Sequence, residues 1–161
     1  MAPVARVVSG GQTGVDRAAL DWAIRHGIPH GGWCPRGRKA EDGRLDPVYL
    51  LQETESAGYR QRTRQNVIDS DGTLILNLGE LDGGTRRTVA LAHALGRPHL
   101  LLQVDDGLAA ESVPRLLEWL SRESVAVLNI AGPRESKRPG AYWFASMLLD
   151  WLVGRGKAVG E

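Results

Sequence analysis

The sequence has little cysteine and no long apolar run, and each absence excludes a class of protein. Cys34 is the only cysteine, so the chain cannot form an internal disulfide. No stretch approaches the roughly 18 to 20 continuous apolar residues that a membrane span requires. The first apolar residues run directly into a glycine-containing segment, without the apolar core and cleavage site of an export signal. We therefore expect a cytoplasmic protein that does not associate with a membrane.

The chain also lacks an excess of charge of one sign. Its 20 Lys and Arg residues nearly balance its 19 Asp and Glu residues, which leaves a net charge of +1. Affinity for a nucleic-acid backbone grows with the number of phosphates neutralised, so this balance argues against a nucleic-acid-binding protein. The spacing of the four histidines and the single cysteine matches no zinc site, so we expect no metal site. These residues are His26, His30, His93, His99 and Cys34.

Short β-rich segments alternate with helical patterns along the chain. The predicted strands are 4–10, 31–35, 72–78, 99–104 and 125–132. Most are too apolar for a sheet with one wet face and are typical of buried parallel strands. The pattern predicts an α/β fold, namely a single-domain, Rossmann-like, doubly wound and mainly parallel sheet with helices on both faces. We expect one domain over residues 1–161, with a frayed tail at about 154–161.

The last two helices carry apolar stripes at helical spacing, which predict core-facing residues. The stripes are Val113, Leu116, Leu117 and Leu120, then Phe144, Met147, Leu148, Trp151 and Leu152. Trp119 and Trp143 lie beside these stripes, where either side chain could cover a partner subunit. We expect a homo-oligomer, either a dimer or a tetramer.

A first glycine loop, "SGGQTG", joins the first strand to the first helix. It lacks the first glycine of a dinucleotide fingerprint and the Lys of a P-loop, which excludes both motifs. Small residues let backbone N–H groups approach an oxyanion, and a helix N-terminus adds positive partial charge. The candidate ligand-binding residues are Gly10, Gly11, Gln12, Thr13 and Gly14. The alternative is a tight strand-to-helix turn that binds nothing.

A second glycine loop follows the strand at 72–78 and leads into another helix. Gly83, Gly84 and Thr85 bring further N–H groups and a hydroxyl to the start of that helix. Ligands of open α/β sheets bind beyond the carboxyl ends of the strands. The two loops therefore predict one shared site for phosphate or sulfate at that edge of the sheet.

Other polar residues near the predicted strand ends add candidates. Arginine suits phosphate and carboxylate oxygens, which favours Arg36, Arg62 and Arg134 as ligand-binding residues, together with Asn66. The alternative for the arginines is an ordinary surface position. Glu41 and Asp42 are adjacent acids near a predicted strand end and are therefore the candidate catalytic carboxylates, and the alternative for both is a solvated turn.

Four segments together resemble the family of molybdenum carrier proteins. They are "GGQTGVDRAALDWAIRHGIPHGGWCPRGRKAEDG", "YRQRTRQNVIDSDGTLIL", "GELDGGTRRT" and "NIAGPRESKRPGAY". That family is similar in fold to the molybdenum cofactor carriers and, more distantly, to the Lonely Guy phosphoribohydrolases and lysine decarboxylase-like proteins. All of these are Rossmann-like and oligomeric. The resemblance implies that the molybdenum cofactor, a phosphorylated molybdopterin, is the bound ligand, with its pterin end toward residues 34–42.

The phosphoribohydrolases carry a "PGGxGTxxE" loop whose glutamate acts on the ribosyl bond. Here the sequence "DGGTRRT" keeps Gly-Gly-Thr, but Arg86, Arg87 and Thr88 occupy the positions where the acid is expected. Cleavage of a glycosidic bond without a placed carboxylate lacks its proton donor. We therefore expect a binding or carrier protein, and the alternative is a nucleotide-binding protein or a nucleoside-monophosphate phosphoribohydrolase.

Overall fold

The computed structural model describes residues 2–105 and 109–158, and it confirms the predicted fold class. Its main sheet has five strands, every neighbouring pair parallel, in the order β2-β1-β9-β7-β8. The strands are β1 (Arg6–Val8), β2 (His30–Gly31), β7 (Gly72–Asn77), β8 (His99–Gln103) and β9 (Val127–Ala131). Each overlaps one of the five strands predicted from the sequence.

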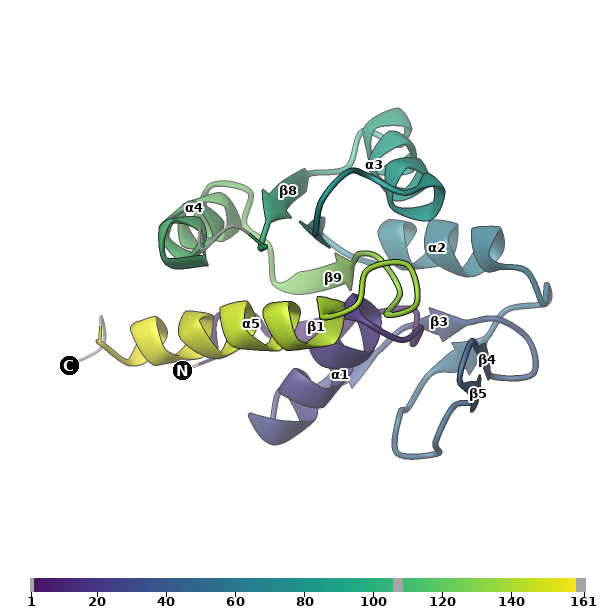
Figure 1. The fold of residues 1–161 in the computed structure, drawn as a ribbon. Helices are drawn as coiled ribbons and strands as arrows, with labels where there is room; N and C mark the ends of the chain where they lie inside the picture. Colours follow the sequence, from purple (N-terminus) through teal and green to yellow (C-terminus); the bar gives the residue numbers. More distant parts are fainter. Residues whose placement is uncertain (1, 106–108, 159–161) are drawn as a thin grey trace.

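Five helices cover both faces of this sheet (Figure 1). They are α1 (Val15–Arg25), α2 (Tyr59–Ile68), α3 (Gly83–Ala94), α4 (Ala109–Arg122) and α5 (Ala141–Ala158). Helix α5 packs against α1 and α4 on one face, and α2 packs against α3 on the other. Gly27, with a φ of 64°, follows the end of α1, where a left-handed backbone conformation favours glycine.

The last strand of the chain, β9, lies at the centre of the sheet between β1 and β7. If strands are counted from β9, the observed order becomes the first five positions of the Rossmann order 3-2-1-4-5-6. The point where this order reverses lies between β9 and β7. Ligands of such sheets bind in the crevice outside the carboxyl ends of the strands at that point.

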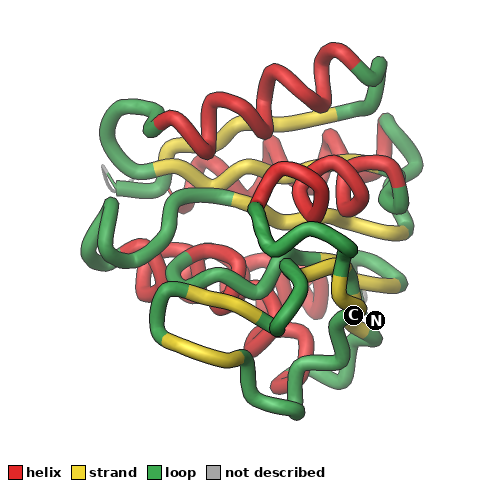
Figure 2. Tube along the Cα trace, turned by 90° about the vertical axis from the view of Figure 1, so that its right-hand side faces the viewer, coloured by secondary structure: helices red, strands yellow, loops and turns green. Residues whose placement is uncertain are grey.

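A small second layer lies between β2 and α2 in the chain. Strand β3 (Trp33–Cys34) pairs in parallel with β6 (Gln52–Glu53), and β4 (Lys39–Ala40) forms a hairpin with β5 (Gly43–Arg44). Long loops join these short strands (Figure 2). They enclose a separate apolar cluster made of Leu20, Cys34, Ala40, Leu45 and Leu51. This layer lies next to the first glycine loop, because a Cβ on Gly11 would come within 2.8 Å of Leu45 and Leu51.

The main core corrects two expectations about the last helices. Trp119 is only 3% exposed and packs over Gly72, so it cannot cover a partner subunit. In α5 the buried stripe consists of Ala141, Ala145, Leu148, Leu149 and Leu152. Trp151 is 43% exposed, because the helix is rotated so that its small residues, rather than its tryptophans, face α1 and the sheet. Trp143 is 58% exposed, and self-association stays a prediction.

Helix α5 continues as far as Ala158, so only residues 159–161 of the segment predicted to fray lie outside the described residues. Across the described residues, no helix combines the length and apolar character needed to cross a membrane.

Gly14 is the position where the fold is most sensitive to an added side chain. Its φ is 77°, and a Cβ there would clash with the carbonyl oxygen of Pro133 and lie 2.8 Å from the amide nitrogen of Glu135. We expect Gly14→Ala to lower the free energy of unfolding by at least ~2 kcal/mol, since the left-handed conformation and the clash both cost energy. Denaturant unfolding monitored by tryptophan fluorescence measures this.

Gly154 provides the matched control, because it lies inside α5 with nothing within 4 Å of an added Cβ. Gly154→Ala should raise the free energy of unfolding by up to about 1 kcal/mol through helix propensity. Equal effects of the two substitutions would contradict the assigned packing of α1 against the loop that follows β9.

Candidate functional site

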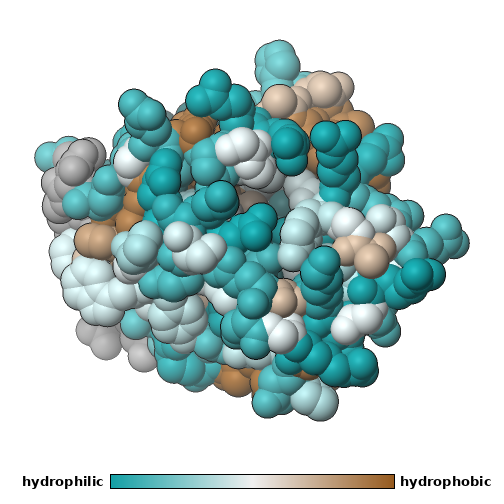
Figure 3. Space-filling model, turned by 45° about the vertical axis from the view of Figure 1, so that its right-hand side comes forward, coloured by the Kyte–Doolittle hydropathy of each residue, from teal (hydrophilic) through white to brown (hydrophobic). Residues whose placement is uncertain are grey.

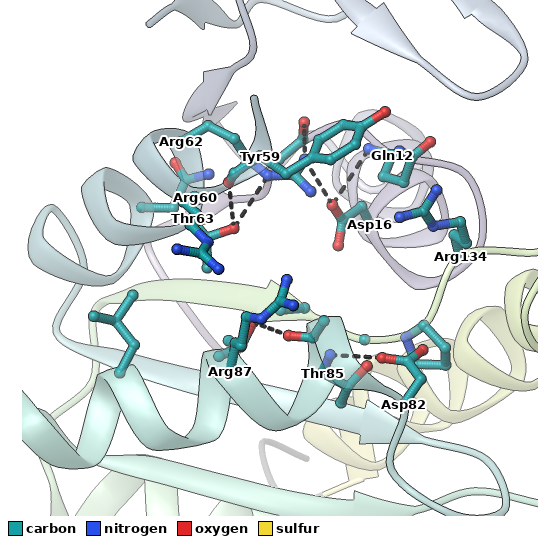
Figure 4. Close-up of a pocket in the computed structure, with 18 of the residues that line it drawn as sticks. Gln12, Asp16, Tyr59, Arg60, Arg62, Thr63, Asp82, Thr85, Arg87 and Arg134 are labelled. Atoms are coloured by element: carbon teal, nitrogen blue, oxygen red, sulfur yellow. Dashed lines mark hydrogen bonds and ion pairs between the residues drawn. The ribbon is translucent and has the colours of Figure 1, made fainter. Parts of the chain in front are cut away.

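A cavity of about 590 Å³ opens at the carboxyl edge of the sheet, where β9 and β7 meet. Its walls come from the loop after β1 with the first turn of α1, helix α2, the N-terminal part of α3, and the end of β9 with its following loop (Figure 4). This is the crevice that the strand order predicts. The surface on this side of the molecule is mainly hydrophilic (Figure 3).

The predicted site residues divide into two groups according to whether they line this cavity. Those that line it are Gly10, Gln12, Arg62, Asn66, Gly83, Gly84, Thr85 and Arg134. Those that do not are Gly11, Thr13, Gly14 and Arg36. The two glycine loops therefore do contribute to one cavity, although the first contributes only Gly10 and Gln12. Whether these residues bind a ligand stays a prediction.

The cavity is rich in positive charge. Its basic residues are Arg60, Arg62, Arg64, Arg87, Arg134 and Lys137, against two acids, Asp16 and Asp82. Within the described part of the chain, no hydrogen bond or ion pair engages the side chains of Arg60, Arg64, Arg87 or Lys137. Such a set of unpaired cations in a crevice favours an anionic ligand.

Two buried polar atoms of the cavity lining have no hydrogen-bond partner among the described residues. They are Nε2 of Gln12 and Oγ1 of Thr85, in residues that are 5% and 3% exposed. A buried polar group without a partner costs free energy, and native proteins satisfy nearly all of them. Both atoms therefore mark places where a ligand can complete the hydrogen bonding.

Several backbone N–H groups of the first glycine loop already donate to acceptors within the protein. The N–H of Val15 donates to Pro133 O (3.3 Å), and the N–H of Thr13 donates to Oε1 of its neighbour Gln12 (3.0 Å). The N–H of Gln12 donates to Asp16 Oδ2 (3.3 Å). These three N–H groups already have acceptors within the protein. Gly11 and Gly14 thus act as close-packing turn residues, which was the alternative interpretation of this loop.

The second glycine loop keeps more of its groups available. The N–H of Thr85 donates to Asp82 Oδ1 (2.7 Å), so Asp82 caps α3 and uses one of the amides that we expected to face an anion. The hydroxyl of Thr85 and the backbones of Gly83 and Gly84 remain at the cavity wall. The Thr85 hydroxyl, which has no partner among the described residues, therefore indicates a bound ligand more clearly than the Thr85 amide, which Asp82 already uses.

Arg62 and Asn66 hold α2 in place as well as lining the cavity. Arg62 Nη1 donates to Gly10 O (2.9 Å) and lies 3.5 Å from Asp16 Oδ2. Asn66 exchanges two hydrogen bonds with the backbone of Trp33, at 2.8 and 3.0 Å. Arg134 lies over the ring of Tyr59, 5.4 Å from its centroid, and 3.9 Å from Glu41 Oε2. Of these cations, Arg134 is the one not bound to a backbone carbonyl.

Asp16 is the functional candidate that the sequence prediction missed. The residue is 6% exposed, and one of its oxygens points into the cavity (Figure 4). Burial raises the pKa of its carboxyl group, and the cation of Arg62 opposes that shift. An acid in the first turn of a helix is ordinarily a helix-dipole or capping residue, and only the position of Arg62 and α2, distant in sequence, makes Asp16 part of a cavity.

The carboxylates favoured for hydrolysis, Glu41 and Asp42, do not line the cavity. Glu41 accepts hydrogen bonds from the hydroxyl of Thr13 and from the backbone and hydroxyl of Ser136. Asp42 forms an ion pair with Arg17 at 2.9 Å. Both acids connect loops rather than reach the crevice, so the catalytic interpretation of the pair has no support in this geometry.

The segment around Cys34 is also separate from the cavity. Cys34 is completely buried in the small apolar cluster, and burial raises the pKa of its thiol. None of residues 34–42, toward which we expected a pterin to lie, lines the cavity. Within the described ranges, no cluster of three or more His, Cys, Asp or Glu side chains could hold a metal ion.

Glu41 gives this region a testable pH dependence. Although its partial burial acts to raise it, hydrogen bonds from Ser136 and Thr13 hold the pKa of Glu41 below its ordinary value of 4.5. The stability that Glu41 contributes is therefore present above pH 4.5 and is lost as the pH falls through the lower, folded-state pKa. We expect Glu41→Gln to destabilise the protein at pH 7 and to have little effect near pH 3, as measured by urea unfolding.

Glu118→Gln serves as the control, because the Glu118 side chain is 76% exposed and its ion pair with Arg122 is 4.0 Å long. It should leave stability nearly unchanged at both pH values. A destabilisation by Glu41→Gln that is the same at pH 3 and pH 7 would contradict the assigned hydrogen bonds.

Comparisons with known proteins agree with this architecture. Among solved structures, the chain is similar to the "Putative molybdenum carrier protein" of Syntrophus aciditrophicus SB, with 44% identity and a TM-score of 0.91. The match covers 94% of this chain and 96% of that chain. No match was found among curated proteins. Residues 7–153 match the model of a circularly permutated family, consistent with a sheet whose strand in the first Rossmann position comes last in the chain. The chain belongs to the circularly permutated YpsA SLOG family.

Proposed function

We propose that this protein binds a phosphorylated pterin, the molybdenum cofactor, in the cavity at the carboxyl ends of β9 and β7. The observation that carries the proposal is the buried, unpartnered hydroxyl of Thr85 in a cavity lined by unpaired cations. The name of the relative from Syntrophus aciditrophicus SB, 44% identical, supports a molybdenum carrier rather than another anion-binding protein.

The residues present fit the organic part of such a ligand. A volume of about 590 Å³ is within the range of small-molecule sites. Thr85 and Arg87 lie at the start of α3, where a phosphate would gain a hydroxyl hydrogen bond and a cation. Tyr59, Leu91 and Ile130 provide apolar surface for a ring system. The carboxylate of Asp82 offsets part of the positive charge at the start of α3. This favours a ligand that carries a single phosphate there.

The residues present do not fit a site for bare molybdenum. Cys34 is buried away from the cavity, and within the described residues no His, Cys, Asp and Glu side chains gather into a metal site. When bound, the cofactor itself would supply the metal, held by the dithiolene sulfurs of its pterin. The role of this chain would be to bind the phosphate and shield the ring.

Removing the Thr85 hydroxyl separates ligand binding from stability. Thr85 Oγ1 has no partner among the described residues, so Thr85→Ala should leave thermal unfolding of the free protein unchanged or slightly raised. Binding of a fluorescent pterin phosphate should weaken about ten- to a hundred-fold, because a hydrogen bond to a charged group contributes roughly 1.5 to 3 kcal/mol. Fluorescence titration measures the affinity.

Thr88→Ala is the matched control on the same wall of the cavity. Thr88 lies one turn later in α3, and its hydroxyl already donates to Gly84 O (3.2 Å). This substitution should change pterin affinity much less than Thr85→Ala does. Equal losses from the two variants, or no loss from either, would count against the proposed phosphate position.

The second candidate function, hydrolysis of nucleoside monophosphates, is favoured only by the presence of Asp16, a buried carboxyl group that faces the cavity. Arg86, Arg87 and Thr88 follow the second glycine loop, so no acid stands there to act on a ribosyl bond. We expect purified protein to release little free base from nucleoside monophosphates, as measured by chromatography. Sustained release of base that Asp16→Ala abolishes would replace the carrier proposal with the hydrolase.

A further inference from the structure

The side-chain amide of Gln12 has a fixed orientation at the wall of the cavity. Its Oε1 accepts the N–H of Thr13 (3.0 Å) and the N–H of Glu41 (2.8 Å), which settles the orientation of the amide. The remaining group, Nε2, is buried and has no partner among the described residues. Because Gln12 is 5% exposed and lines the cavity, Nε2 can be satisfied by an acceptor on a ligand.

Asp16 presents a fixed acceptor beside this donor. Its Oδ2 accepts the N–H of Gln12 (3.3 Å) and lies 3.5 Å from Arg62 Nη1. Its other oxygen points into the cavity (Figure 4). The Ser9 hydroxyl also lies beside this carboxyl group and acts to lower its pKa, although it donates its hydrogen to Ile130 O (2.8 Å). A carboxylate oxygen has two lone pairs, so this one can accept two N–H groups from a ligand.

The pattern of acceptor and donor is complementary to one edge of a particular heterocycle. A 2-amino-4-oxopyrimidine ring carries, in a row, an exocyclic amino group, a ring N–H and a carbonyl oxygen. The first two are donors and match Asp16, and the third is an acceptor and matches Gln12 Nε2. Adenine places a ring nitrogen lone pair where this edge has its N–H, and that lone pair would face the carboxylate.

We propose that Asp16 and Gln12 are specificity-determining residues that select ligands with a 2-amino-4-oxopyrimidine ring, the group shared by pterins and guanine, over adenine. The proposal rests on the proposed function, because it assumes that a phosphorylated heterocycle occupies this cavity. It assigns the ring to the wall formed by Gln12 and Asp16, whereas the phosphate lies at Thr85. Tyr59 also lines the cavity, and the guanidinium groups of Arg62 and Arg134 lie over its ring.

A single substitution should reverse this preference. In Asp16→Asn, the amide oxygen should stay toward the donors, Gln12 N–H and Arg62, which leaves the NH2 group facing the cavity. That group repels the 2-amino group of guanine and donates to the 2-oxo group of xanthine. We expect wild-type protein to bind GMP at least ten-fold more tightly than AMP or XMP, and Asp16→Asn to prefer XMP to GMP.

A second variant tests the donor. Gln12→Glu keeps an oxygen for the N–H groups of Thr13 and Glu41 but replaces the Nε2 donor with an acceptor. It should weaken binding of GMP and of 6-hydroxymethylpterin phosphate about ten-fold or more. Binding of 2-aminopurine riboside monophosphate, which lacks both the 6-oxo group and the ring N–H, should be weak in the wild type and should not weaken further in this variant. Circular dichroism and thermal unfolding establish that each variant folds.

The outcomes distinguish this inference from the function on which it rests. Equal affinities for GMP, AMP and XMP in the wild type and in Asp16→Asn would overturn the inference, while sensitivity of those affinities to Thr85→Ala would leave the proposed function standing. Failure of all the phosphorylated probes to bind would overturn both. If the inference holds, direct comparison of 6-hydroxymethylpterin phosphate with GMP shows which of the two sources of the ring the site prefers.

Discussion

The position of β9 at the centre of the sheet is the constraint on which the rest of the structure depends. It pairs with β1 on one side and β7 on the other, so the two outer parts of the sheet meet only through this strand. The loop that follows β9 then packs against Gly14 at the start of α1. Because the loop after β9 packs against it, the first glycine loop leaves little room for a ligand. The open part of the crevice lies beside α2 and α3.

The fold could be predicted from the sequence because its main signals are local. Each buried strand, such as 72–78, is a short and nearly continuous apolar run, and Gly27 marks the end of α1. The orientation of α5 could not be predicted in the same way. A helix with apolar residues on more than one side has no single stripe, and packing against α1 selects the face with alanines over the face with Trp151. The burial of Trp119 against the core, rather than against a partner subunit, could not be predicted either, because Gly72, which makes room for it, is distant in sequence.

The candidate site was predictable only where it depends on the carboxyl ends of strands. Gly83, Gly84 and Thr85 line the cavity because they follow β7. Asp16 and Gln12 form a polar pair because Arg62 and Glu41, from other segments, orient them. No spacing in the sequence encodes that arrangement. The same limit applies to Glu41 and Asp42, which are near the strand ends in sequence but have their hydrogen bonds with Ser136 and Arg17.

The central place of the last strand also has a consequence for the synthesis of the protein. Ser9, beside β1, donates its hydroxyl to Ile130 O in β9, 121 residues away, so the middle of the sheet is completed only after β9 has left the ribosome. Until then β1 and β7 each lack a neighbour and expose apolar strand edges, which are sites of aggregation. Contacts of such long range also slow folding. In an unpermuted Rossmann domain, by contrast, the central strand is made first, so its neighbours can pair with it as they are synthesised.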